Sequence, residues 1–106
     1  MDVVPADARG NPDEAQLLEE LARGDVGILA VSAVQFTSGW VADLERLGRA
    51  CREHGAWLVV DAIQALGQMP LDVRACGIDV LATAGHKWLC GPFGTGFAYV
   101  RRELVE

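Results

Sequence analysis

The sequence predicts an α/β fold, in which a three-layer, mostly parallel sheet is flanked by helices. Continuous runs of β-branched and other apolar residues recur along the chain and are typical of strands buried on both faces of a parallel sheet. Segments with apolar residues at helical spacing separate these runs, and this alternation favours parallel strands joined by right-handed crossovers. The 106 residues suffice for one small domain or a part of a larger one.

The first helix and strand are expected in the N-terminal third. Asn11 and Pro12 predict a helix start, with a capping side chain followed by a proline at the first helical position. Apolar residues at helical spacing follow, and Gly24 predicts the end of this helix. The apolar run 26–32 then predicts a strand buried on both faces.

The middle of the chain predicts a second helix and strand. A helix is expected over 41–54 or 43–54, with acidic residues in its first turn and basic residues near its end, as the helix dipole favours. Gly55 is the expected end signal. Residues 57–61 predict a second buried strand that finishes on the carboxylate of Asp61.

The C-terminal part predicts two more strands. A loop or short helical turn is expected at 63–69, and at most a short helix at 73–76. A third strand is expected at 78–83. The glycines of 91–96 stand in the reverse order of the dinucleotide-binding fingerprint, so we interpret them as a tight turn that leads into a final strand at 97–100.

Charge and composition exclude several classes of protein. The net charge of −6 argues against nucleic acid as a partner, because phosphate binding requires a basic patch. The longest apolar stretch, 27–34, is too short to span a bilayer, and the N-terminus does not resemble a secretion signal. The three cysteines lack metal-site or disulfide-framework spacing, so we expect free thiols, no metal site and a cytoplasmic location.

Polar residues follow two of the predicted strands. Asp61 ends the second strand, and His86 and Lys87 come just after the third. The carboxyl ends of neighbouring parallel strands face one crevice, which is where ligands of open α/β sheets bind. The pattern therefore predicts a functional site at this edge, and the alternative is a plain ion pair or a capping aspartate.

Three motifs at these strand ends resemble one family. A D-x-x-Q-x-x-G pattern begins at Asp61, a Thr-Ala-Gly-His-Lys segment ends at Lys87, 26 positions further on, and a glycine-rich run covers 88–96. Together they resemble the class V aminotransferases, the pyridoxal 5'-phosphate (PLP) enzymes of fold type I that include cysteine desulfurases, selenocysteine lyases and isopenicillin N epimerase. The resemblance covers nearly the whole chain and implies PLP as the cofactor.

The resemblance assigns the central chemistry to two residues. Asp61 would hold the protonated nitrogen of the pyridine ring, which lets the ring withdraw electrons from the α-carbon of an amino acid. Lys87 would form a Schiff base with the cofactor aldehyde and then act as general base at that carbon. An arginine could do neither, because it keeps its proton.

Three further cofactor contacts are implied by the same resemblance. Gln64 would bind near the phenolic oxygen of PLP, and otherwise would be a solvent-facing loop residue. His86 would lie near the phosphate, and otherwise would be structural. Ala84 stands where the desulfurase branch has a serine, so Thr83 is the candidate substitute for that hydroxyl. Cys90 is interpreted as packing, and the tryptophans as core or interface residues.

The family's proteins are several times longer, so residues 1–106 resemble the central part of the PLP-binding large domain, without the N-terminal part and the small C-terminal domain. The resemblance implies an amino-acid substrate and a homodimer in the full-length protein. It leaves open whether the enzyme is a transaminase, lyase, desulfurase or epimerase. We expect the chain alone to associate and to show little or no turnover. The alternative is an inactive α/β scaffold, or a truncated fragment that does not bind PLP by itself.

Overall fold

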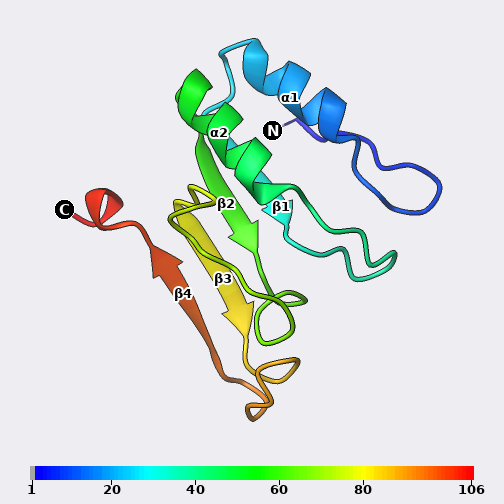
Figure 1. Ribbon diagram of the computed structural model, residues 1–106, viewed down its shortest axis with the longest axis vertical. Helices are drawn as coiled ribbons and strands as arrows, with labels where there is room; N and C mark the ends of the chain where they lie inside the picture. Colours follow the sequence, from blue (N-terminus) through cyan, green and yellow to red (C-terminus); the bar gives the residue numbers. More distant parts are fainter. Residues whose placement is uncertain (1) are drawn as a thin grey trace.

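The structure is a computed structural model that describes residues 2–106 (Figure 1). It contains a four-stranded sheet in the order β1-β2-β3-β4, in which β1, β2 and β3 are parallel and β4 is antiparallel to β3. The elements are α1 (Glu14–Ala22), β1 (Ile28–Ser32), α2 (Leu44–His54), β2 (Trp57–Asp61), β3 (Val80–Ala84), β4 (Gly96–Val100) and the 3-10 turn η1 (Arg102–Leu104). The predicted α/β class with a mostly parallel sheet is confirmed.

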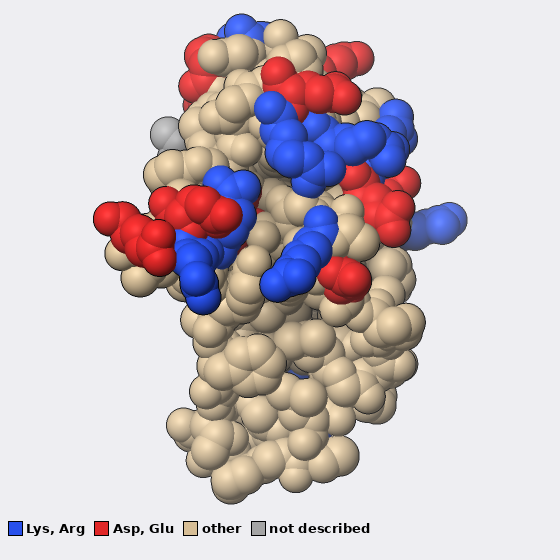
Figure 2. All heavy atoms as spheres, turned by 60° about the vertical axis from the view of Figure 1, so that its left-hand side comes forward, with Lys and Arg blue, Asp and Glu red and all other residues tan. Residues whose placement is uncertain are grey.

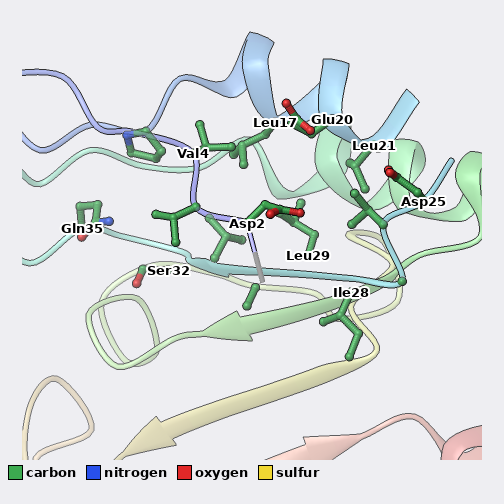
Figure 3. Close-up of a pocket in the computed structure, with 16 residues that line it drawn as sticks. Asp2, Val4, Leu17, Glu20, Leu21, Asp25, Ile28, Leu29, Ser32 and Gln35 are labelled. Atoms are coloured by element: carbon green, nitrogen blue, oxygen red, sulfur yellow. The ribbon is translucent and has the colours of Figure 1, made fainter. Parts of the chain in front are cut away.

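Both helices lie on the same side of the sheet (Figures 1 and 3). Leu47 of α2 is 0% exposed and Leu58 and Val60 of β2 are at most 1% exposed, so the core lies between this helix and β2. The opposite face is open within residues 2–106, and it exposes Ile28 and Trp57. The prediction that these strands are buried on both faces is therefore wrong for this chain, because the described residues supply a helical layer to only one face.

The first helix begins two residues later than predicted. Asp13 is its cap, and the Asp13 carboxylate accepts the N–H groups of Ala15 and Gln16. Asn11 instead closes a turn with Asp7, whose carboxylate accepts both its backbone and its side-chain N–H. The prediction of Asn11 as the cap is wrong because this local turn competes for the same asparagine.

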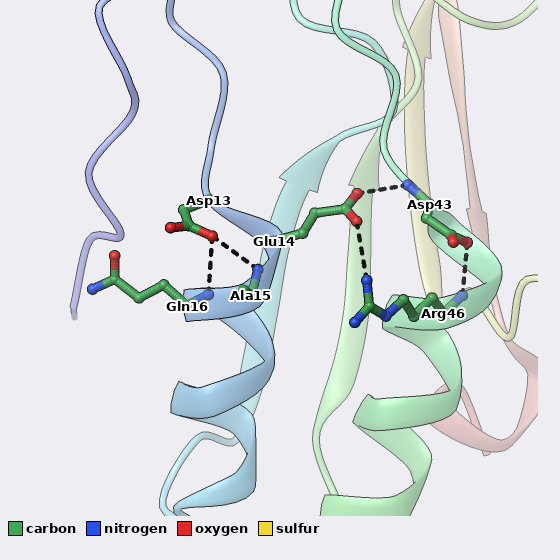
Figure 4. Close-up of polar contacts among 6 residues, drawn as sticks. All are labelled: Asp13, Glu14, Ala15, Gln16, Asp43 and Arg46. Carbon is green, nitrogen blue, oxygen red and sulfur yellow. Dashed lines mark hydrogen bonds and ion pairs between the residues drawn. The ribbon is translucent and has the colours of Figure 1, made fainter.

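The start of α1 is tied to the start of α2 (Figure 4). The Glu14 carboxylate accepts the backbone N–H of Asp43 at 2.8 Å and lies 4.0 Å from Nη1 of Arg46. Asp43 in turn caps α2 by accepting the N–H of Arg46. This confirms the predicted start of the second helix near residue 43, and Gly55 ends it in the left-handed conformation with φ of 72°.

The connection from β2 to β3 crosses the helix side of the sheet without a regular helix. Ala62 and Ala65 are fully buried in it, and the predicted short helix at 73–76 is a turn capped by Asp72. A side chain at Gly48 of α2 would put its Cβ 1.8 Å from the Cys76 carbonyl oxygen. The glycine therefore allows the connection to lie directly against α2.

The third strand starts at Val80, two residues later than predicted. Asp79 precedes it and uses its side chain to bind β2 and the end of β4. Asp79 is 3% exposed, accepts the N–H of Leu58 at 2.7 Å and forms an ion pair with Arg101 at 2.9 Å. These contacts connect the amino end of β3 to β2 and to the end of β4.

Charged side chains gather at one end of the molecule. Figure 2 shows them over the half that contains the helices, while the half around the carboxyl ends of β2 and β3 is largely uncharged on this face.

Candidate functional site at the carboxyl ends of the strands

Asp61 is the last residue of β2 and lies opposite Ser32 of β1 and Ala82 of β3. Alternation along the strand puts it on the open face, because its neighbour Val60 is buried on the helix side. Its Oδ1 accepts the N–H of Ile63 at 2.9 Å, and the carboxylate is exposed. It borders a hollow of about 320 Å³ lined by Ala30, Val31, Ser32, Val59, Val60, Asp61 and Ala82.

Lys87 lies in the loop after β3 and is half-buried. Its Nζ is 4.7 Å from the ring centroid of Phe36, which belongs to the loop after β1. Because β2 lies between β1 and β3, this contact joins their loops across the strand end that carries Asp61. Within residues 2–106 neither Asp61 nor Lys87 forms an ion pair, so the alternative of a plain ion pair is not found. The alternative of a capping aspartate is found in part, because Asp61 accepts the Ile63 N–H of the next turn.

The glycine-rich segment forms the tight turn expected from the sequence. The Gly85 N–H donates to the Thr95 carbonyl at 2.8 Å, and the Gly91 N–H donates to the Gly85 carbonyl at 2.7 Å. A Cβ at Gly85 would lie 2.4 Å from Oγ1 of Thr95, so only glycine allows this approach. The turn returns the chain into β4 and fixes the base of the segment that carries His86 and Lys87.

His86 is exposed in this turn, and its ring stacks on Phe93 with a centroid distance of 4.9 Å and an interplanar angle of 20°. Phe93 is 88% exposed. The pair thus presents an imidazole at the same end of the sheet as Lys87.

Gln64 lies in the turn that follows Asp61, and its Oε1 accepts the indole N–H of Trp88 at 3.3 Å. The glycine of the D-x-x-Q-x-x-G pattern has a physical reason in this turn. Gly67 has φ of 92°, and a Cβ there would lie 2.4 Å from the Trp88 carbonyl oxygen. The loops after β2 and β3 are therefore in direct backbone contact.

Thr83 is not brought together with Asp61. It is 7% exposed and lies on the helix side of β3 with Leu81, while Ala82 and Ala84 share the face of Asp61. Its Oγ1 has no hydrogen-bond partner among the described residues.

Cys90 does not serve as core packing, and that interpretation is wrong. Its side chain is exposed, and its backbone has φ of 53°, an unusual conformation for a residue other than glycine. The turn conformation explains this, because the Cys90 N–H closes the turn onto the Lys87 carbonyl. A local sequence pattern does not reveal such a position.

A larger cavity than the hollow beside Asp61 lies elsewhere, between α1, the N-terminal segment and the outer edge of β1 (Figure 3). It measures about 620 Å³ and is lined by apolar residues together with carboxylates such as Asp2, Glu20 and Asp25. None of the residues predicted to bind a cofactor borders it. The chemistry at the strand ends, rather than cavity size, therefore defines the candidate site.

Sequence reasoning missed the aromatic partners of the predicted site residues. Phe36 contacts Lys87, Phe93 stacks on His86, and Trp88 binds Gln64. Phe36 follows a predicted strand and Phe93 sits in the glycine-rich run, so their positions at strand ends were the available signal.

Comparison with known proteins identifies the family. A family model described as Aminotransferase class-V matches residues 1–106. The chain belongs to the class V aminotransferase family. Among relatives of this family member is a protein from Aeropyrum pernix described as a probable cysteine desulfurase, with 38% identity over 98% of this chain and 25% of the relative.

Solved structures of the family have the same fold. An apo cysteine desulfurase from Thermococcus onnurineus superposes with a TM-score of 0.87 at 33% identity, over 97% of this chain and 25% of the other. The cysteine desulfurase CsdA from Escherichia coli, in an S-sulfonic acid form, gives 0.83 at 35% identity over the same shares. The class V chain thus spans about a quarter of the length of these relatives.

No group of three or more His, Cys, Asp or Glu residues is placed to hold a metal ion within 2–106. Neither helix in that range combines the length and apolarity needed to cross a bilayer.

Proposed function

We propose that this chain is the central part of the PLP-binding large domain of an enzyme that acts on an amino acid, and that Lys87 carries the cofactor through a Schiff base. One observation carries the proposal. The Lys87 amine has no ion-pair partner among residues 2–106 and is held across the strand end that carries Asp61, with both residues in their family motifs.

The residues present fit PLP. One oxygen of the Asp61 carboxylate accepts a turn N–H, which leaves the other available to keep a ring nitrogen protonated. On the face seen in Figure 2 the strand-end half carries few charged side chains, so few charges there would compete with the Asp61 carboxylate for a cationic ring. When bound, PLP would supply the electron sink for the α-carbon. The Lys87 amine would serve as the nucleophile for the aldehyde and as the base for the α-proton.

The other proposed cofactor contacts, Gln64, His86 and Thr83, are supported by different observations. Gln64 and His86 lie in the loops after β2 and β3, at the same end as Asp61 and Lys87. For Thr83 the support is its buried hydroxyl, which is unpartnered within 2–106, and against it stands its place on the face of β3 opposite to that of Asp61.

For the whole protein we propose the class of substrate, the assembly and the location, but no specific reaction. Relatives named as cysteine desulfurases and one named as an aminotransferase both match this chain, so we propose an amino acid as substrate and no single reaction. The open face with Ile28 and Trp57 supports packing against further parts of a longer protein, and membership of the family supports our proposal of a homodimer of the full-length protein. The cysteines, unpaired among the described residues, support a cytoplasmic location.

Borohydride trapping tests the proposal. The protein is mixed with PLP, reduced, and digested for peptide mass spectrometry. Lys87 is the only lysine, so the α-amine is the single competing amine and serves as an internal reference. We expect a pyridoxyl adduct on Lys87 well above that on the α-amine, and no such adduct in Lys87→Ala. Equal labelling of the two amines would contradict PLP binding by this chain and favour an inactive scaffold or a truncated fragment that does not bind PLP by itself.

A further inference from the structure

We infer that Trp88 is a positioning residue that fixes the orientation of the Gln64 amide, so that Gln64 acts as a hydrogen-bond donor to an anionic oxygen in the site. The inference rests on the proposed function, in which that oxygen is the phenolic oxygen of the cofactor. Its starting point is the hydrogen bond from the indole Nε1 of Trp88 to Oε1 of Gln64, at 3.3 Å.

The chemistry of the two groups sets the orientation. An indole N–H only donates, whereas an amide has one accepting and one donating end. With Oε1 engaged by Trp88, Nε2 is the end that remains, and no hydrogen bond uses it among residues 2–106. Without the indole, the amide could rotate by 180° and present its oxygen, which would repel an anion.

The backbone holds the two residues in register. Gly67 packs against the Trp88 carbonyl so closely that a Cβ would lie 2.4 Å away, which joins the loop of Gln64 to the loop of Trp88. Trp88 is 50% exposed, so core packing does not account for its position. This hydrogen bond between the two loops thus orients the Gln64 amide and contributes little to the stability of the fold.

The test uses the pH dependence of the absorbance of the cofactor bound to Lys87. A donor to the phenolic oxygen stabilises the form of the cofactor that carries more negative charge there. Trp88→Phe keeps a ring but removes the donor, so the midpoint of the titration should rise by about half a pH unit or more, the shift equivalent to an ordinary hydrogen bond.

Two further variants make the test specific to Gln64. Gln64→Leu should shift the midpoint in the same direction, and the double variant Trp88→Phe/Gln64→Leu should shift it no further than Gln64→Leu alone. Trp57→Phe is the matched control, because Trp57 is similarly exposed at the opposite end of β2, and its midpoint should stay at the wild-type value. Additive shifts in the double variant, or an unchanged midpoint in Trp88→Phe, would overturn the inference.

A cofactor-free readout separates this inference from the proposed function. In wild-type protein the two Nε2 protons of Gln64 should give distinct NMR signals that broaden or shift in Trp88→Phe and stay unchanged in Trp57→Phe. If PLP fails to label Lys87 but these signals respond, the proposed function fails and the positioning of Gln64 stands. If the signals do not respond to Trp88→Phe, the positioning fails whatever the cofactor does.

Discussion

Two aspartates next to neighbouring strands show how differently the two ends of this sheet are used. Asp79, at the amino end of β3, is 3% exposed and satisfied by the Leu58 N–H and the Arg101 guanidinium. Asp61, at the carboxyl end of β2, is exposed and accepts one turn N–H. The first carboxylate is fully committed to the fold, while the second retains the capacity to bind a ligand.

The same contrast extends to the residues around them. The amino ends and the helices hold the ion pairs and caps, including Glu14 between α1 and α2. The carboxyl ends hold glycine turns and aromatic side chains around Lys87 and His86, with few charges near them. A site that must receive a charged cofactor needs groups that are free to bind it, and among the described residues Asp61 and Lys87 at the carboxyl ends form no ion pair.

The largest expected effect separates the two aspartates by stability. Asp79→Ala leaves the Arg101 charge and the Leu58 N–H without their partner, so we expect a loss of about 3 kcal/mol in the free energy of unfolding. Asp61→Ala removes one exposed turn hydrogen bond and should cost less than about 1 kcal/mol. Urea denaturation of both variants measures the difference. Equal losses would show that Asp61 is also a structural residue.

Two glycines in the loops at the carboxyl ends of the parallel strands both have positive φ. Gly67 has φ of 92° and packs on the Trp88 carbonyl, whereas Gly94 has φ of 81° and nothing within 4 Å. Gly94→Ala should cost about 1 kcal/mol for its conformation alone. Gly67→Ala adds a clash and should cost about 2–3 kcal/mol, with weaker PLP labelling of Lys87. Thermal unfolding and trapping of both variants check this, and equal behaviour would mean that the loops are not in close contact.

The sequence was sufficient to predict the elements whose signals are local. The apolar periodicity of α2 and its start near residue 43, and the positions of Asp61 and Lys87 at and after strand ends, follow from short patterns. The sequence was insufficient where a residue distant in the chain determines the local conformation or the contacts of a side chain. The Asn11 side chain is taken by Asp7, burial of β1 depends on which face receives helices, and the partners of Lys87 and His86 come from other loops. Thr83 was predicted from a motif, but the alternation of side chains along β3 places it on the helix side of the sheet.

The smallest predicted effect belongs to the helix-covered half and is seen in alkaline solution. Burial, helped by the charge of Asp79, raises the pKa of the Cys51 thiol from 9.0 to about 11. The folded state keeps this proton while the unfolded state loses it, so stability falls as pH rises from about 9 to 11. The loss should be about 1 kcal/mol at pH 10.

Cys51→Ala tests this assignment. The variant should be less stable at neutral pH because of the cavity it creates, but its fall in stability above pH 9 should be shallower than in the wild type. Burial also raises the pKa of Cys76, so a smaller decline should remain. Denaturation midpoints at pH 8 and pH 10 give the comparison, and parallel declines in the two proteins would refute the role of Cys51.

The most direct test of the functional end is the stoichiometry of PLP trapping in wild type and Asp61→Asn. The amide keeps the shape of the side chain but cannot hold a cationic ring nitrogen. In the wild type we expect more pyridoxyl label on Lys87 than on the α-amine. In Asp61→Asn the ratio of Lys87 label to α-amine label should fall towards the ratio seen in unfolded chain, while the free energy of unfolding stays almost unchanged. An undiminished ratio in Asp61→Asn would contradict the claim that this carboxylate holds the cofactor.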